Sequence, residues 1–435
     1  MYINNFVMST QIIHTLNYHQ AQASKHLLNI STGLRIRTVA DDPSGWAIGQ
    51  RMDVRIRSLD AASSNSQQMK SLLKVADGGI SSTVDILKTL KEKAIEAAND
   101  TATDSDRQTI QKLFDQYADQ IDDNAYVSYN GKYLLDGSRQ GGAQATQQAY
   151  TNRAFSESTA LDTKLTDLAR RNGDSLGITD TDTVNVSYVK QGKTYSASFS
   201  AKDATVKDLF EKMNAIDGAV FDVDDISTTG TIGTNAYGET VTTSDEANAL
   251  TVKAKTAGTD GAIAGFTIGV TNAAGQEKKS VNNVFNEFYE SIAPRNAQGD
   301  SSLYSQTSAD ANRGMKIPLG DLRAESLGLR GRDGTVLDVT TRAGANAAMS
   351  VLDNALSRAL DQQTTVGAMS SRLDYTISNL TVESENLTDA KSTLLDADMA
   401  KEMLAYTKEN VLMQAAMAML AHNNQNAAWF LSLLG

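Results

Sequence analysis

An apolar stripe with heptad spacing runs along each end of this chain. Counting from residue 6 to residue 34 in alternating steps of three and four residues, seven of the nine positions carry apolar side chains. The same steps meet an apolar or Tyr side chain at nine of eleven positions between residues 399 and 434. Such spacing predicts coiled-coil helices. The residues expected to form this seam are Phe6, Ile13, Leu16, Leu27, Ile30, Leu34, Met399, Met403, Tyr406, Met413, Met417, Leu420, Leu431 and Leu434.

The C-terminal helix is apolar on more than one side. Leu404, Val411, Leu412, Ala415 and Met419 all lie off the main stripe. A helix of this kind is buried on more than one side. A helical hairpin within one molecule is the simpler interpretation, but one partner helix cannot cover two faces. The pattern therefore favours assembly with other chains.

Composition excludes several classes of protein. The 435 residues include no Cys, so disulfides and thiolate metal sites are excluded. The net charge of −12 disfavours a nucleic-acid binder. No apolar run is long enough to span a membrane, and the N-terminal residues lack a signal-peptide pattern. A membrane-surface binder is disfavoured because residues 1–43 and 393–435 lack a strongly basic polar face. From composition alone we would expect a cytoplasmic protein.

The middle of the chain changes from helical to alternating patterns, which predicts a nested α+β fold. Asn130-Gly131 separates two short β-prone runs and fits the positive φ angles of a type I′ hairpin turn. We expect long terminal helices that form a coiled-coil inner domain, a helical-bundle shoulder domain with a β-hairpin, and an inserted β-rich outer domain. The expected boundaries are 1–43 with 393–435 for the inner domain, 44–172 with 300–392 for the shoulder with its hairpin near 126–137, and 173–299 for the insert.

Several motifs resemble those of bacterial flagellins. They are "NISTGLRIRTVADDPSGWAIGQRM", "YNGKYLLDG", "VGAMSSRLDYTISNL", "ENLTDAKS" and "DADMAKEMLAYTKENVLMQAAMAMLAHNNQ", in that order along the chain. The resemblance covers roughly residues 1–140 and 340–435. It implies a structural subunit that polymerises through its terminal helices into the flagellar filament for motility. A hook–filament junction protein of the same family is the alternative, and "YNGKYLLDG" and "LAHNNQ" favour flagellin.

The resemblance also implies a location and partners. A flagellin is exported unfolded through the flagellar channel without a cleavable signal peptide, so the expected site is the extracellular filament rather than the cytoplasm. The implied partners are further copies of this chain, the flagellar export apparatus and its export chaperone, and the hook-associated and cap proteins. No nucleic acid and no membrane is expected to bind.

The stretch from Ser31 to Ile48 interrupts the helical pattern, and in flagellins it links the inner coiled coil to the outer bundle. A plain interhelical turn with solvated charges is the alternative interpretation. Proline removes a backbone donor and restricts the residue before it, and an aspartate can cap the helix that follows. The residues expected to end the first helix, start the next and form ion pairs are Gly33, Arg35, Arg37, Asp41, Asp42 and Pro43.

Many flagellins are recognised by a Toll-like receptor through the first shoulder helix. In the corresponding stretch Glu92 matches the family, but Thr89 stands where an Arg is typical and Lys93 replaces an apolar residue. Losing a central Arg from a receptor interface can cost a few kcal/mol. We therefore expect recognition to be weak or absent, with a weakened innate-receptor face that comprises Glu92, Thr89, Lys93, Ile110 and Gln111.

Enzyme motifs are absent from the sequence. It contains no HExxH, P-loop or G-x-S-x-G pattern. His19 and His26 lie a heptad apart but have no third metal ligand at suitable spacing. Residues 173–299 contain no His, which excludes the metallopeptidase insert of some flagellins. Asp222, Asp224 and Asp225 lack a calcium-loop signature and are expected to be a solvated face. We expect no catalytic residue, no metal and no cofactor.

Overall fold

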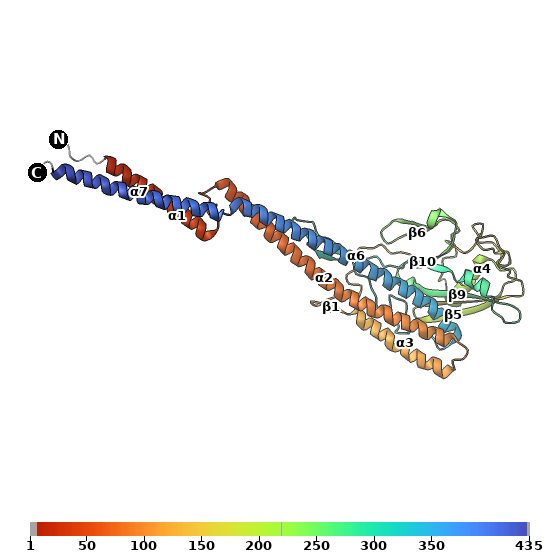
Figure 1. Cartoon of the computed structure of the whole chain (residues 1–435). Coiled ribbons are helices and arrows are strands. Elements are labelled where there is room, and N and C mark those ends of the chain that lie inside the picture. Colours follow the sequence, from red (N-terminus) through yellow and green to blue (C-terminus); the bar gives the residue numbers. More distant parts are fainter. Residues whose placement is uncertain (1–6, 219, 433–435) are drawn as a thin grey trace. The chain divides into compact units, whose positions relative to one another are not determined.

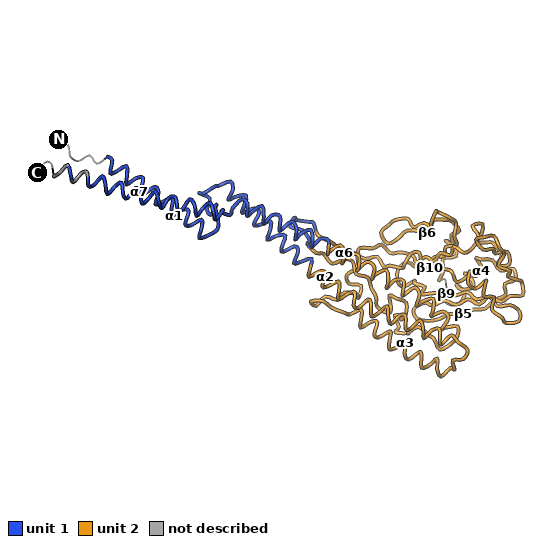
Figure 2. The backbone as a smooth tube through the Cα atoms, viewed as in Figure 1, with its two compact units in different colours: residues 1–66, 306–313, 375–435 blue, residues 67–305, 314–374 orange. Residues whose placement is uncertain are grey.

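The computed structural model describes residues 7–218 and 220–432 (Figure 1). The chain divides into two compact units (Figure 2). The expected α+β fold with long terminal helices and a β-rich middle is confirmed. Unit 1 contains residues 1–66, 306–313 and 375–435, and unit 2 contains residues 67–305 and 314–374.

Unit 1 is built from helices that come from the two ends of the chain. Helix α1 (Val7–Thr32) lies beside α7 (Met399–Ser432) as an antiparallel pair (Figure 1). Ser9 accepts a hydrogen bond from Asn423 near one end of the pair, at 2.6 Å. The unit also contains the beginning of α2 (Pro43–Ala98) and the end of α6 (Arg342–Leu395), which pack through Leu59, Ala62 and Leu380.

The helical part of unit 2 packs α3 (Asp104–Ala125) with the remaining lengths of α2 and α6. Thr103 begins α3 with a capping box, in which its hydroxyl accepts from the Asp106 N–H and the Asp106 carboxylate accepts from the Thr103 N–H. Apolar side chains spaced along one face of each helix fill the shared core. Its fully buried members include Leu73, Ile80, Leu87, Phe114, Ile121, Ala348, Val351 and Leu352.

The expected β-hairpin is confirmed. Strand β1 (Ser128–Tyr129) pairs antiparallel with β2 (Lys132–Tyr133). Asn130 and Gly131 connect the strands with φ angles of 49° and 73°, the left-handed values that a type I′ turn requires. Leu134 and Leu135, which follow the hairpin, are fully buried in the helical core and fix the hairpin to it.

The β-rich part of unit 2 contains two three-stranded antiparallel sheets. In the first, β4 (Thr183–Lys190) lies between β5 (Lys193–Ser200) and β9 (Ile263–Thr271). In the second, β3 (Ala149–Asn152) lies between β10 (Phe288–Ile292) and β8 (Leu250–Lys253). Strand β3 precedes the expected insert boundary at residue 173, whereas β8 and β10 follow it. The second sheet therefore combines strands from both sides of that boundary.

Short elements complete the β-rich part, and aromatic rings fill its core. Phe266 makes edge-to-face contacts with Tyr150, Phe210 and Phe221. This core is separate from that of the helical part. The remaining elements are η1 (Leu165–Asp167), α4 (Val206–Asp217), β6 (Thr231–Thr234) paired with β7 (Thr240–Thr242), η2 (Ser244–Glu246), η3 (Thr259–Gly261), α5 (Lys279–Phe285), and β11 (Leu303–Ser305) paired with β12 (Met315–Ile317).

Candidate assembly surface

The face of α1 that packs against α7 has heptad spacing. Of the residues expected in the seam, Leu16 and Ile30 lie half-buried on this face. Ile13 and Leu27 are instead exposed, at 43% and 50%. At every second position of the seam, the residue that faces α7 is therefore the one just before the expected residue. The buried and half-buried residues at heptad spacing are Ser9, Ile12, Leu16, His19, Ala23, His26 and Ile30.

Two histidines of this seam bind glutamates of the opposite helix. His19 Nδ1 lies 2.6 Å from Glu409 Oε2, and His26 Nδ1 lies 2.6 Å from Glu402 Oε2. Glu402 also accepts a hydrogen bond from Asn29, at 3.3 Å. The apolar heptad spacing did not predict these contacts. The signal was available, because the two histidines and the two glutamates are each spaced by one heptad.

The expected α7 seam residues fall into two groups. Tyr406, Met413 and Leu420 are half-buried, whereas Met399, Met403 and Met417 are exposed. Phe6 and Leu434 lie outside the described residues, as does the side chain of Leu431. Leu34 is half-buried and pairs its backbone with Asp396, just before α7 begins.

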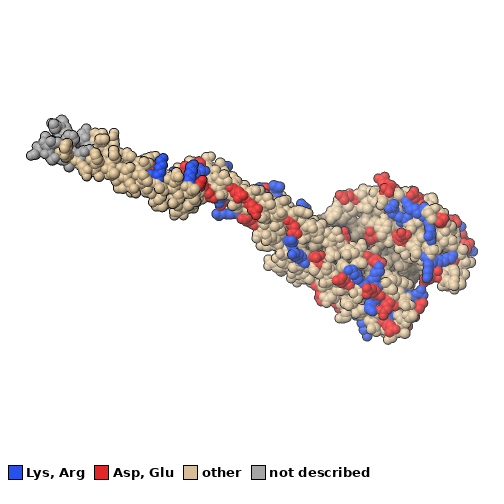
Figure 3. Space-filling view, viewed as in Figure 1, with Lys and Arg blue, Asp and Glu red and all other residues tan. Residues whose placement is uncertain are grey.

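The α1–α7 pair leaves an extensive apolar surface uncovered. Leu404, Val411 and Met419 are 73%, 58% and 59% exposed. In Figure 3 the visible surface of this pair carries few charged side chains, unlike that of unit 2. Monomeric soluble proteins rarely expose contiguous apolar patches of this kind unless the patch binds a partner. Met403, Leu404, Thr407, Val411 and Leu412 line a shallow apolar depression on α7, beside the charged Lys408.

The segment between α1 and α2 is held to the α6–α7 connection by backbone hydrogen bonds. Gly33 ends α1 with φ 71°, and its carbonyl accepts from the Ala397 N–H at 2.8 Å. The Arg35 N–H donates to the Leu395 carbonyl at 2.7 Å, and its guanidinium donates to the Leu394 carbonyl at 2.7 Å. Among the described residues Arg35 forms no ion pair, so its expected ion pairing stays a prediction.

Asp41 and Asp42 accept hydrogen bonds from different parts of this segment. Asp42 caps α2, which begins at Pro43, by accepting from the N–H groups of Ser44 and Gly45 at 3.0 Å each. The Asp41 carboxylate accepts from the N–H groups of Thr38 and Arg37, and these bonds lower its pKa. A neighbouring ammonium, Lys25, lies 3.6 Å from Asp41. Arg37 forms no ion pair within the described part of the chain.

The expected innate-receptor residues do not share one exposed face. Glu92 is exposed, and Thr89 and Lys93 are half-buried on α2, where Lys93 donates to Glu96 at 2.6 Å. Ile110 is 8% exposed and belongs to the helical core, which corrects its expected place on a receptor face. The Gln111 side chain is committed to the chain itself, because it donates to the Leu337 carbonyl and accepts from the Val339 N–H.

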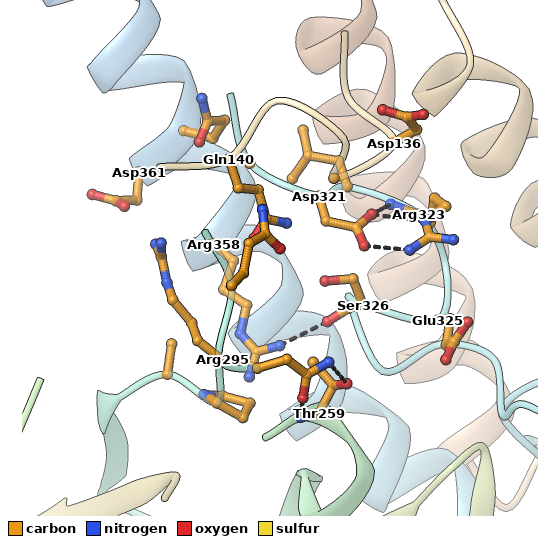
Figure 4. Close-up of a pocket in the computed structure, with 18 of the residues that line it drawn as sticks. Asp136, Gln140, Thr259, Arg295, Asp321, Arg323, Glu325, Ser326, Arg358 and Asp361 are labelled. Carbon is orange, nitrogen blue, oxygen red and sulfur yellow. Dashed lines mark hydrogen bonds and ion pairs between the residues drawn. The ribbon is translucent and has the colours of Figure 1, made fainter. Parts of the chain in front are cut away.

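A cavity of about 270 Å³ in unit 2 is lined largely by polar and charged side chains (Figure 4). Arg323 donates to both carboxylate oxygens of Asp321, at 3.0 and 2.7 Å, which raises the Arg323 pKa. Arg358 donates to the Ser326 carbonyl at 2.8 Å. It also forms a bidentate pair with Glu290. These guanidinium groups hold elements of the fold together. Within the described ranges, no cluster of three or more His, Cys, Asp or Glu residues has an arrangement that could hold a metal.

Family models match both ends of this chain, and curated relatives match nearly all of it. The family model of the bacterial flagellin N-terminal helical region matches residues 3–140, and that of the C-terminal helical region matches residues 349–434. A flagellin from Clostridium tyrobutyricum is 31% identical over 98% of this chain and 99% of its own length. A flagellin from Bacillus subtilis is 27% identical over 100% of both chains.

A solved structure of FliC from Burkholderia pseudomallei is also similar, with 20% identity over 70% of this chain and 99% of that chain, at a TM-score of 0.27. None of the described helices has the length and apolar character needed to cross a membrane.

Proposed function

This chain belongs to the bacterial flagellin family and is a subunit of the flagellar filament, and on that premise we propose that α1 and α7 together form its polymerisation device. The observation that carries the proposal is the apolar surface that remains after the two helices have packed on each other. Leu404 and Val411 on α7, and Ile13 and Leu27 on α1, are the exposed residues that further copies would cover.

Burial of these apolar side chains supplies the free energy of assembly. Moving a Leu, Val, Ile or Met side chain from water into a packed interface contributes about 1.5–3 kcal/mol. Several such side chains on one subunit therefore supply a large driving force, which is repeated at every subunit of a helical polymer. Three expected seam residues become intersubunit contacts, because α1 leaves their side chains exposed: Met399, Met403 and Met417.

The proposal gives each part of the chain a place in the filament. Residues 1–43 and 393–435 form the inner tube, residues 44–172 and 300–392 form the shoulder around it, and residues 173–299 project outward. Strand β10 anchors the projecting part, because its Glu290 binds Arg358 of α6. This role is structural and requires no catalysis, no metal and no cofactor.

The proposal extends to partners that the family implies. The subunit travels unfolded through the flagellar export apparatus, with an export chaperone, and is not cleaved at a signal peptide. In the filament it meets hook-associated and cap proteins as well as copies of itself. Recognition by the Toll-like receptor is weak or absent, because Thr89 and Lys93 lack the expected side chains and Ile110 is buried. Full stimulation of reporter cells at nanomolar protein would contradict this last statement.

Polymerisation of the purified chain tests the proposed function. The full-length protein and a version without residues 1–43 and 393–435 are mixed with sheared filament seeds and followed by sedimentation and negative-stain microscopy. Long filaments from the full-length chain alone are the expected result. A full-length chain that stays monomeric in the presence of seeds contradicts the proposal. Copy number then separates a filament subunit from a junction protein, because only the former accumulates in thousands per filament.

A further inference from the structure

The exposed methionines of this chain are concentrated on the terminal helices. Among the described residues, all five exposed methionine side chains lie on α1 or α7, with exposed fractions between 44% and 63%. The described methionines elsewhere are buried or half-buried, including Met213 and Met315, which are 0% and 4% exposed. The exposed set is Met8, Met399, Met403, Met417 and Met419.

Exposed thioethers react with peroxides. The sulfur attacks one oxygen of hydrogen peroxide, the O–O bond breaks as the S–O bond forms, and water leaves once a proton has moved to the departing oxygen. Sulfur loses two electrons and peroxide gains them, so the products are methionine sulfoxide and water. The chain contains no cysteine, so no thiol competes for the oxidant.

The product has properties opposite to those that an apolar interface needs. A thioether is a flexible apolar group that fills irregular gaps between helices. A sulfoxide is polar and has a strong acceptor oxygen, and burying such a group without a donor is unfavourable. The depression that Met403 lines on α7 is mostly apolar, with Leu404, Val411 and Leu412, and its side-chain donors are the Thr407 hydroxyl and the Lys408 ammonium.

We propose that Met8, Met399, Met403, Met417 and Met419 form an oxidation site of the free subunit, and that their conversion to sulfoxides blocks its assembly. The inference rests on the proposed function, because it requires that polymerisation buries these side chains. It adds a chemical consequence: the free subunit is sensitive to peroxide, whereas the same residues inside a filament are protected. Methionine sulfoxide reductases restore the thioether and hence assembly.

Oxidation before and after assembly tests the proposal. Full-length monomers and preformed filaments are treated with the same concentration of hydrogen peroxide, and peptide mass spectrometry follows each methionine. We expect oxidation of the five sites to be at least tenfold slower in filaments, with Met213 and Met315 slow in both samples. Oxidised monomers should elongate seeds at least tenfold more slowly than untreated ones. Equal oxidation rates in the two samples would overturn the proposal.

Substitution separates the site from other oxidation damage. A variant with leucine at all five positions keeps the side-chain volume nearly unchanged. After peroxide treatment it should elongate within about twofold of its untreated rate. A matched control, Met349→Leu with Met369→Leu, replaces two half-buried methionines of α6. After peroxide treatment, its elongation rate should fall as much as that of the parent.

Two further outcomes are decisive. Parent monomers that carry sulfoxides at the five positions and elongate at the untreated rate would overturn the inference alone. An untreated chain that never elongates seeds would overturn the proposed function and this inference with it.

Discussion

His19 Nδ1 lies 2.6 Å from Glu409 Oε2 across the α1–α7 interface, and both side chains are only about one-sixth exposed, at 16% and 15%. A hydrogen bond to a carboxylate in such a half-buried place is stronger than a neutral one. Together with His26 and Glu402, one heptad away, this contact fixes the register of the two helices through polar rather than apolar groups.

The first prediction concerns this pair. Glu409→Gln should weaken the α1–α7 pairing by about 1–2 kcal/mol, because it replaces a charge-assisted hydrogen bond by a neutral one. The double variant His19→Leu with Glu409→Leu should recover much of this loss, since an apolar pair removes both desolvation penalties. Hydrogen exchange of α1 amides in assembled filaments measures both effects. His14→Leu is the control at an exposed position of α1. A double variant that loses as much pairing free energy as Glu409→Gln, or more, would contradict this account.

The second prediction concerns the start of α2. Asp42→Ala should lower the free energy of unfolding by about 1 kcal/mol, because the N–H groups of Ser44 and Gly45 lose their acceptor. Asp42→Asn should retain most of the stability, because asparagine is also a good cap. Urea unfolding followed by circular dichroism at 222 nm compares the two variants with the parent. Equal loss in both variants would show that charge, and not capping, is what Asp42 supplies.

The third prediction concerns pH. Burial alone would raise the pKa of Asp182, whose side chain is 1% exposed, but the Lys278 ammonium at 2.5 Å and the Thr179 N–H outweigh burial and lower the pKa below 3.8. A carboxyl whose folded pKa is lowered adds stability above its unfolded pKa. That stability is fully present above about pH 4 and is lost as the pH falls through the folded pKa.

Asp182→Asn isolates this contribution. The variant should lose about 3 kcal/mol at pH 7, because it leaves the Lys278 ammonium without its carboxylate. Its stability should then change less between pH 5 and pH 2 than that of the parent. Near-UV circular dichroism of the stacked Tyr188 and Tyr195 rings reports unfolding of this region. The same acid dependence in variant and parent would rule out Asp182 as the titrating group.

The fourth prediction concerns the anchor between β10 and α6. Glu290→Gln should destabilise unit 2 by about 3–4 kcal/mol, because Arg358 is held by both carboxylate oxygens and its side chain is only 20% exposed. Arg332→Gln is the matched control, since that side chain is half exposed and its ion pairs should contribute no more than about 1 kcal/mol. The free energy of unfolding in urea distinguishes them. Similar losses in the two variants would contradict the anchoring role of Glu290.

The sequence predicted elements whose signals are local. Asn130-Gly131 predicted the hairpin because few residues other than glycine and asparagine adopt positive φ easily. The heptad spacing predicted the terminal helices but not which apolar residues face α7. Ile12 and Ile13 are adjacent and equally apolar, so spacing alone does not choose between them. The choice depends on the His19 and His26 contacts, which join residues almost four hundred positions apart.

Other features could not be predicted from the sequence, because the element is short or because its place depends on distant residues. Strand β3 has four residues, all buried, so it lacks the alternation that marks a half-exposed strand. Its central place in a sheet with β8 and β10 depends on strands that lie about a hundred or more residues away in the sequence. Ile110 lies on a helix whose apolar face fixes its burial, but the resemblance placed it on a receptor face. A resemblance in sequence identifies the corresponding position but does not show how its side chain packs in this chain.

The apolar surface of α7 is the centre of this account, and the critical concentration for seeded elongation measures its contribution most directly. Leu404→Lys places a charge at a position that is 73% exposed in one chain and buried in the proposed filament. Tyr237→Lys makes a similar change at a position of the β-rich part that is 62% exposed.

The account predicts that Leu404→Lys raises the critical concentration roughly 100-fold, which corresponds to about 3 kcal/mol, whereas Tyr237→Lys leaves it within about twofold of the parent. A Leu404→Lys variant that elongates seeds at the parent's critical concentration would contradict the claim that α7 is buried between subunits.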